Sequence, residues 1–145
     1  MEAFPHNYRV SGSATSDNHV ALTAPGLSEI VSAPPAEFGG PGDKWSPETL
    51  LVGAVADCFI LTFRAVAQAS KLEWVHLECH VTGTLDRIER AMRFTGINVE
   101  ATLEVPAGTD IEKAKKLLQK AEQGCLITNS LIAESSLQAA VQVSS

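Results

Sequence analysis

Apolar and polar residues alternate along two segments in the middle of the chain, the pattern expected of half-buried strands. Over residues 73–85 the apolar face consists of Val75, Leu77, Cys79, Val81 and Leu85. Trp74, His76, Glu78, His80 and Thr82 fall on the opposite face. Residues 93–105 alternate in the same way, with Ile97, Val99, Ala101, Leu103 and Val105 facing inward. The polar segment 86–91 predicts a hairpin connection, so the two strands are expected to form the main antiparallel pair.

Shorter alternating runs lie towards both ends of the chain and predict further strands. They are residues 7–12, 19–24, 27–32 and 137–143. Residues 33–46 contain three prolines and three glycines, a density that predicts a loop. Residues 126–132 remain open between a short helix and a strand.

A long apolar helix is predicted to follow this loop. Ser46 can cap its N-terminus, and Pro47 suits the first helical position. From Leu50 to Phe63 the sequence is apolar around most of the helix circumference, so we expect burial on all sides, inside a sheet or against a second subunit. Asp57 and Arg64 interrupt a stretch that is short for a transmembrane segment, which argues against a membrane span.

A second helix is predicted over residues 110–123. Thr109 and Glu112 have the spacing of an N-terminal capping box, and Gly124 suits the C-terminal cap. Its apolar face consists of Ile111, Ala114, Leu117, Leu118 and Ala121. The order of strands and helices indicates an α+β fold, and the length of 145 residues fits one domain over 1–145.

The net charge of −6 narrows the range of possible binding partners. An acidic chain lacks the basic surface that nucleic-acid binding requires, and no Lys/Arg cluster borders an apolar helix as in peripheral membrane binding. The first ten residues show no secretion signal, which predicts a cytoplasmic protein. In that compartment three cysteines are better suited to redox chemistry than to structural disulfides.

Each cysteine has an ordinary interpretation beside a functional one. Cys58, in the apolar helix, could simply be a buried small hydrophobe, and a reactive thiolate there would need a cation nearby. Cys125 follows a helix end next to a glycine, where the backbone is expected to be accessible, and could be an incidental loop residue or a resolving thiol. Cys79 is predicted to be core. His76 and His80 lie about 13 Å apart along a strand at ~3.3 Å per residue, which excludes a local metal site.

Three stretches of the chain resemble the OsmC/Ohr family of thiol-dependent hydroperoxide reductases. SPETL at 46–50 is similar to the family's helix start, ADCF at 56–59 to the segment around its peroxidatic cysteine, and GCLITNSL at 124–131 to the segment around its second cysteine. The order of elements agrees along nearly the whole chain.

The resemblance implies an OsmC-like fold, with antiparallel sheets around a buried central helix in an intertwined homodimer. It implies that Cys58 is the peroxidatic thiol, that Cys125 resolves it, and that Glu48 orients an activating arginine. The implied activity is reduction of organic hydroperoxides with a dithiol of lipoyl type as reductant, in oxidative stress defence, with no cofactor and no metal. Phe38, Trp45, Phe59 and Phe63 are candidates for an apolar substrate pocket, with ordinary core packing as the alternative.

The chain departs from the family at the activating arginine. Between Val10 and Phe63 it has no arginine, so Arg9 and Lys44 are the possible activating cations, with Arg87, Arg90 or Arg93 acting across a dimer interface as the alternative. Leu126 also replaces the proline that follows the family's second cysteine. The alternative hypothesis is therefore a non-catalytic binding or redox-sensing protein with an apolar pocket at the subunit interface.

Overall fold

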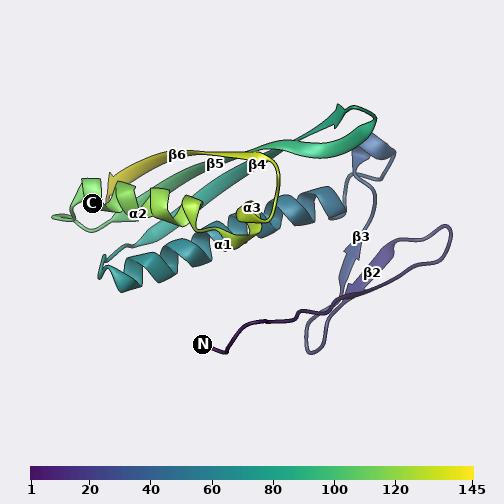
Figure 1. Cartoon of the computed structure of the whole chain (residues 1–145), viewed down its shortest axis with the longest axis horizontal. Helices are drawn as coiled ribbons and strands as arrows, with labels where there is room; N and C mark the ends of the chain where they lie inside the picture. The colour runs from purple at the N-terminus through teal and green to yellow at the C-terminus, as the bar shows by residue number, and fades with distance from the viewer. The chain divides into compact units, whose positions relative to one another are not determined.

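Two three-stranded sheets, one before the long apolar helix and one after it, account for most of the extended structure in the computed structural model (Figure 1). The structure describes all 145 residues and divides into two units, Met1–Leu50 and Leu51–Ser145. The mixture of sheets and helices confirms the predicted α+β class.

The first unit contains an antiparallel sheet in the order β1-β2-β3. Its strands are shorter than the alternation predicted: β1 Ser11–Ser13, β2 Val20–Thr23 and β3 Ile30–Ser32. The loop that follows contains one short 3-10 helix, η1 (Ala36–Phe38). The loop returns to the sheet at Trp45, whose carbonyl accepts a hydrogen bond from the Ala33 N–H at 2.9 Å.

Helix α1 spans Pro47–Ala69, and the predicted N-terminal cap is confirmed. The Thr49 N–H donates to Ser46 Oγ at 3.1 Å, and the Ser46 N–H donates to Thr49 Oγ1 at 2.8 Å. Each residue therefore satisfies a backbone donor of the other, the reciprocal arrangement of a capping box.

The second sheet has the order β4-β5-β6 and contains the long hairpin. Strands β4 (His76–Ile88) and β5 (Ala91–Val105) are antiparallel, as predicted. Strand β6 (Glu134–Val143) runs parallel to β5, so the expectation of purely antiparallel sheets was wrong for this sheet. A parallel neighbour requires a crossover connection, which helix α2 (Ile111–Gln123) supplies.

The hairpin turn is tighter than the polar segment 86–91 suggested. Glu89 and Arg90 form the connection, with φ of 51° and 75°. Positive φ at both central residues is the geometry that matches the twist of paired strands. The alternation also fails at two places. Trp74 and Val75 precede β4, so the strand alternation does not apply to them: Trp74 packs on the core and Val75 is 54% exposed. The second place is a register shift after Thr84, which leaves Leu85 37% exposed.

The core of the second unit lies between one face of this sheet and helices α1 and α2 (Figure 1). The five predicted inward residues of β5 are all buried. Helix α1 contributes one stripe at a spacing of four residues: Val55, Phe59, Phe63 and Ala67. Within the single chain α1 is not buried on all sides, because Leu61, for example, is 50% exposed, and its burial against a second subunit stays a prediction.

Helix α1 is long and apolar enough to cross a membrane by length and composition alone, with a mean hydropathy of 1.9 over 18 residues. Its 23 residues correct the expectation that the stretch is too short. One such helix is weak evidence for insertion, since the core helix of a soluble protein passes the same test.

The ends of α2 agree only in part with the sequence prediction. Asp110, not Thr109, is the N-cap, and its carboxylate accepts a hydrogen bond from the Lys113 N–H at 3.1 Å. The Thr109 hydroxyl instead donates to the Pro106 carbonyl at 2.7 Å. Gly124 is the C-cap as predicted, and the ambiguous segment begins with the short helix α3 (Leu126–Asn129).

Gly83 on β4 lies where α1 approaches the sheet, and its substitution tests this packing. A Cβ at Gly83 would stand 2.8 Å from Val52 Cγ2 and 3.0 Å from Phe94 Cε1. Gly83→Ala is therefore expected to lower the free energy of unfolding by about 1–3 kcal/mol in urea titrations.

Gly96 on β5 is the matched control, because the nearest atom to a Cβ there is the Glu134 carbonyl oxygen at 3.9 Å. Gly96→Ala should be neutral or slightly stabilising, since glycine in a strand costs about 0.5–1 kcal/mol relative to alanine. Equal losses at Gly83 and Gly96 would contradict the packing of α1 on the hairpin.

Candidate functional site

Two cysteines that are far apart in the sequence come together in the second unit. Cys58 lies in α1 beside the buried stripe, one residue before Phe59, and is half-buried. Cys125 follows the C-cap of α2 and is itself the N-cap of α3. The two thiols are free and close enough that each shifts the pKa of the other. The tertiary fold thus brings together the pair on which the sequence hypothesis rests.

Cys125 is only 1% exposed, which corrects the expectation of an accessible position after the helix. The short helix α3 turns back immediately after Gly124, so the side chain of its N-cap residue points inward instead of into solvent. The Thr128 hydroxyl donates to Cys125 Sγ at 3.3 Å. Of the two thiols, Cys58 is therefore the one more open to a reactant.

The surroundings of Cys58 favour its thiolate form. Partial burial is the largest single influence, and by itself it raises the pKa of the thiol. Hydrogen bonds act in the opposite direction, from the Ile127 N–H, the Cys125 thiol, the Thr62 hydroxyl and the Leu126 N–H. Together these bonds hold the pKa of Cys58 below its ordinary value, because a group that donates to the charged form stabilises it.

The surroundings of Cys125 have the opposite effect. Burial raises the pKa of its thiol, and the hydrogen bond and negative charge of Cys58 raise it further. The bonds from Thr128 lower the pKa only in part. The pair therefore combines a thiol with a lowered pKa, Cys58, with a thiol whose pKa is raised, so Cys58 ionises at the lower pH of the two.

Cys79 belongs to the core, as predicted from the alternation. It packs against the main hydrophobic cluster, and its thiol donates to the Ala56 carbonyl at 3.8 Å. Burial, followed by the charge of Glu78, raises the pKa of Cys79. A thiol held in its protonated form is a poor nucleophile.

Sequence reasoning missed the groups that hold the cysteine pair. Thr62 lies four residues after Cys58 and therefore on the same side of α1, a spacing that could have identified it. Thr128 lies three residues after Cys125, the spacing between an N-cap and the first helical turn. The backbone N–H groups of Leu126 and Ile127 also donate to Cys58, and the identity of a side chain does not indicate a backbone donor.

None of the groups that lower the pKa of Cys58 is a cation. The proposed cations and the helix-start carboxylate belong to the first unit. There Arg9 is exposed, Lys44 pairs with Asp43 at 3.5 Å, and Glu48 Oε1 is buried without a hydrogen-bond partner. The roles assigned to these three residues stay predictions.

The four aromatic candidates fall into two groups. Phe59 and Phe63 are fully buried core residues, and Phe63 makes an edge-to-face contact with Trp74. In the first unit, Phe38 is 50% and Trp45 55% exposed. Trp45 and Lys44 line a hollow of about 420 Å³ with Val31, Gly42, Asp43 and Thr49. A shared substrate pocket for the four stays a prediction.

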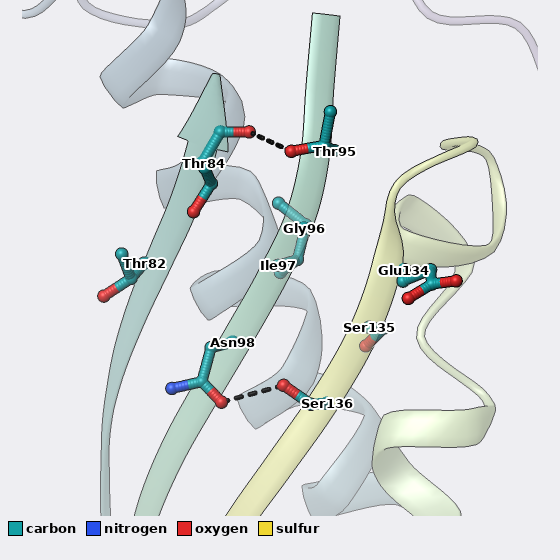
Figure 2. Close-up of a pocket in the computed structure, with 9 residues that line it drawn as sticks. All are labelled: Thr82, Thr84, Thr95, Gly96, Ile97, Asn98, Glu134, Ser135 and Ser136. Carbon is teal, nitrogen blue, oxygen red and sulfur yellow. Dashed lines mark hydrogen bonds between the residues drawn. The ribbon is translucent and has the colours of Figure 1, made fainter. Parts of the chain in front are cut away.

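A second hollow, of about 380 Å³, lies on the face of the β4-β5-β6 sheet that carries its polar side chains (Figure 2). Its walls carry hydroxyls, an amide and the Glu134 carboxylate, and Ser136 donates to Asn98 Oδ1 at 2.9 Å. It contains no thiol and no cation. The structure also contains no group of three or more His, Cys, Asp or Glu that could hold a metal ion.

Comparison with known proteins places the chain in a family. The family described as OsmC-like protein matches residues 40–139, which include both Cys58 and Cys125. The chain belongs to the OsmC family, and the resemblance drawn from the three sequence stretches is confirmed.

Individual relatives are similar to the chain in sequence or in fold. The chain is 31% identical over 107 residues to an uncharacterized protein of Bacillus subtilis, YmaD, covering 72% of this chain and 71% of the relative. An OsmC-like protein of unknown function from Vibrio cholerae has the same fold, with a TM-score of 0.83 at 16% identity over 93% of this chain and 99% of that one. An organic hydroperoxide resistance protein from Legionella pneumophila follows at a TM-score of 0.75 and 23% identity, over 97% and 99%.

The opposite pKa shifts predict selective modification of Cys58. Because the pKa of Cys58 is lowered and those of Cys79 and Cys125 are raised, iodoacetamide should alkylate Cys58 first. Its rate should reach a plateau at a lower pH than that of a free cysteine, as measured by mass spectrometry of the fully reduced protein.

Single variants identify the thiol that iodoacetamide alkylates first. Cys79→Ser should retain this rapid alkylation, and Cys58→Ser should remove it. Rapid alkylation that survives in Cys58→Ser would contradict the assignment of the reactive thiol.

Proposed function

We propose that this protein is a thiol-dependent peroxidase that reduces organic hydroperoxides. The observation that carries the proposal is the proximity of a half-buried thiol with a lowered pKa to a buried thiol with a raised pKa, each of which shifts the pKa of the other. A peroxidatic thiol must react as the thiolate, whereas the resolving thiol must wait until a sulfenic acid has formed. Family membership and neighbours named organic hydroperoxide resistance proteins support the same reaction.

The reaction proceeds in three steps. The Cys58 thiolate attacks the terminal oxygen of a hydroperoxide ROOH, the O–O bond breaks, and the alkoxide leaves as ROH after taking a proton from solvent. Cys58 is thereby oxidised to a sulfenic acid. The Cys125 thiol then attacks the sulfenic sulfur, forming the Cys58–Cys125 disulfide and releasing water. An external dithiol, of lipoyl type or similar, reduces this disulfide by exchange and becomes a disulfide itself.

Apolar side chains beside the thiol pair favour an organic peroxide over hydrogen peroxide. Leu61 lies three residues after Cys58, on the same side of α1, and is 50% exposed. Leu126 follows Cys125 and is 65% exposed. An alkyl or acyl chain can bury these surfaces, which hydrogen peroxide cannot. Phe38, Trp45, Phe59 and Phe63 remain proposed contributors to the pocket.

The active form in this proposal is a cytoplasmic homodimer. Helix α1 is apolar around most of its circumference from Leu50 to Phe63 yet contributes only one buried stripe in the single chain, and a second copy would cover apolar side chains that remain exposed. Glu48 keeps its proposed role of orienting a cation, with Arg9 and Lys44 as candidates. Its buried, unpartnered Oε1 supports this role, since a buried carboxylate oxygen requires a donor.

The proposal predicts consumption of tert-butyl or cumene hydroperoxide by the purified protein with dihydrolipoamide as reductant. Cys58→Ser should abolish turnover, because it removes the attacking sulfur. Cys125→Ser should stop the cycle after one equivalent of alcohol and leave a sulfenic acid that dimedone traps. Activity is followed as peroxide loss and adduct mass.

Cys79→Ser is the matched control, since Cys79 belongs to the core and not to the pair. It should retain most of the turnover of the unmodified protein. Peroxide loss that is equally reduced in Cys58→Ser and Cys79→Ser would rule out the proposed reaction, as would turnover without any disulfide between Cys58 and Cys125.

A further inference from the structure

The hydroxyl group of Thr62 is directed at the sulfur of Cys58. Thr62 Oγ1 lies 3.8 Å from Cys58 Sγ, one turn further along α1. A threonine inside a helix commonly bonds to the backbone carbonyl four residues earlier. Here the hydrogen bond formed by the hydroxyl goes to the side chain at that position instead. Of the two paired thiols, the one more open to a reactant thus has a hydroxyl partner on its own helix.

The methyl group of Thr62 lies close to Gly124, and this placement orients the hydroxyl. A Cβ placed on Gly124 would lie 3.6 Å from Thr62 Cγ2, so this methyl packs beside the backbone where α2 ends and Cys125 follows. Because threonine is branched at Cβ, holding its methyl group also sets the direction of its hydroxyl. The corner that positions Cys125 therefore also orients the donor to Cys58.

We propose that Thr62 is a positioning residue of the thiol site. Its hydroxyl donates to the Cys58 thiolate, and the packing of its methyl group holds that hydroxyl beside the segment that carries Cys125. This inference rests on the proposed peroxidase function and deepens it. The thiolate is stabilised by donors built into one chain, Thr62 together with the N–H groups of Leu126 and Ile127. A cation that reaches the site would add to this stabilisation without being its only source.

The sequence context of Thr62 makes the polar group unusual at this place. It occurs in the run FILTFRA, where the neighbouring positions Phe59, Ile60, Leu61 and Phe63 are apolar. A hydroxyl group in such surroundings needs a partner, because an unpaired one costs free energy on burial. Cys58 Sγ supplies this partner, and the thiolate form accepts the bond more strongly than the thiol.

The test replaces Thr62 and measures the rate at which Cys58 is alkylated, without any peroxide present. Thr62→Val keeps the branched shape and removes the hydroxyl. We expect the rate of Cys58 alkylation at pH 7 to fall about three- to tenfold, and the pH profile to move to higher pH, because a donor to a charged acceptor is lost. Thr62→Ser restores the hydroxyl without the methyl group, so it should recover the pH profile in large part.

Thr82→Val is the matched control, because it removes a threonine hydroxyl from an exposed strand position outside the thiol site. It should leave the alkylation profile of Cys58 unchanged. Thr62→Ala, which removes both groups, should shift the profile at least as far as Thr62→Val and serves if the valine variant does not fold. A Cys58 profile that is the same in the unmodified protein and in Thr62→Val or Thr62→Ala would overturn the inference.

The peroxide assay then separates this inference from the proposed function. If the unmodified protein turns over hydroperoxide, Thr62→Val should lower the rate of sulfenic acid formation by the same factor as alkylation, and Thr62→Ser should recover it. Turnover that is unaffected in Thr62→Val contradicts the role of Thr62 alone. Absence of turnover in the unmodified protein, with the alkylation shift still present, contradicts the peroxidase proposal and leaves the Thr62–Cys58 interaction supported.

Discussion

The packing of one stripe of helix α1 against the β4-β5 hairpin positions everything else in the thiol site. Val55, Phe59, Phe63 and Ala67 are fully buried against the inward face of the sheet, which fixes the rotation of the helix about its axis. Cys58 comes one residue before Phe59, so at about 100° per residue it lies at the edge of the buried stripe. That edge location keeps the thiol half-buried, close to Cys125 and still open to a reactant.

The electrostatic character of the site follows from hydrogen bonding within one chain. Burial alone raises the pKa of both Cys58 and Cys125, and what separates them is the number and kind of donors each receives. The donors to Cys58 come from the start of α3 and from Thr62, and they require no basic residue. This arrangement is consistent with an acidic chain in which the segment from Val10 to Phe63 lacks arginine.

The site was predicted unevenly from the sequence, for physical reasons that differ from residue to residue. Cys58 and Cys125 were identifiable because thiols are rare and their flanking residues are distinctive. The burial of Cys125 was not, since it depends on how α3 turns back after Gly124. The donors at Leu126 and Ile127 were invisible because every residue except proline carries a backbone N–H. Leu126 therefore provides an N–H at the position where the family has a proline.

The sequence by itself determined the local elements, since these depend on short-range patterns: the inward residues of β5, the cap at Ser46 and the helix α1 from Pro47 to Ala69. Tertiary structure alone decided the parallel pairing of β6, the single buried stripe of α1 and the meeting of the two thiols. Periodicity reports which face of an element is apolar, but the partner of that face is set by long-range packing. Cys58 and Cys125 meet only because α2 crosses over to place β6 beside β5 and α3 closes back towards α1.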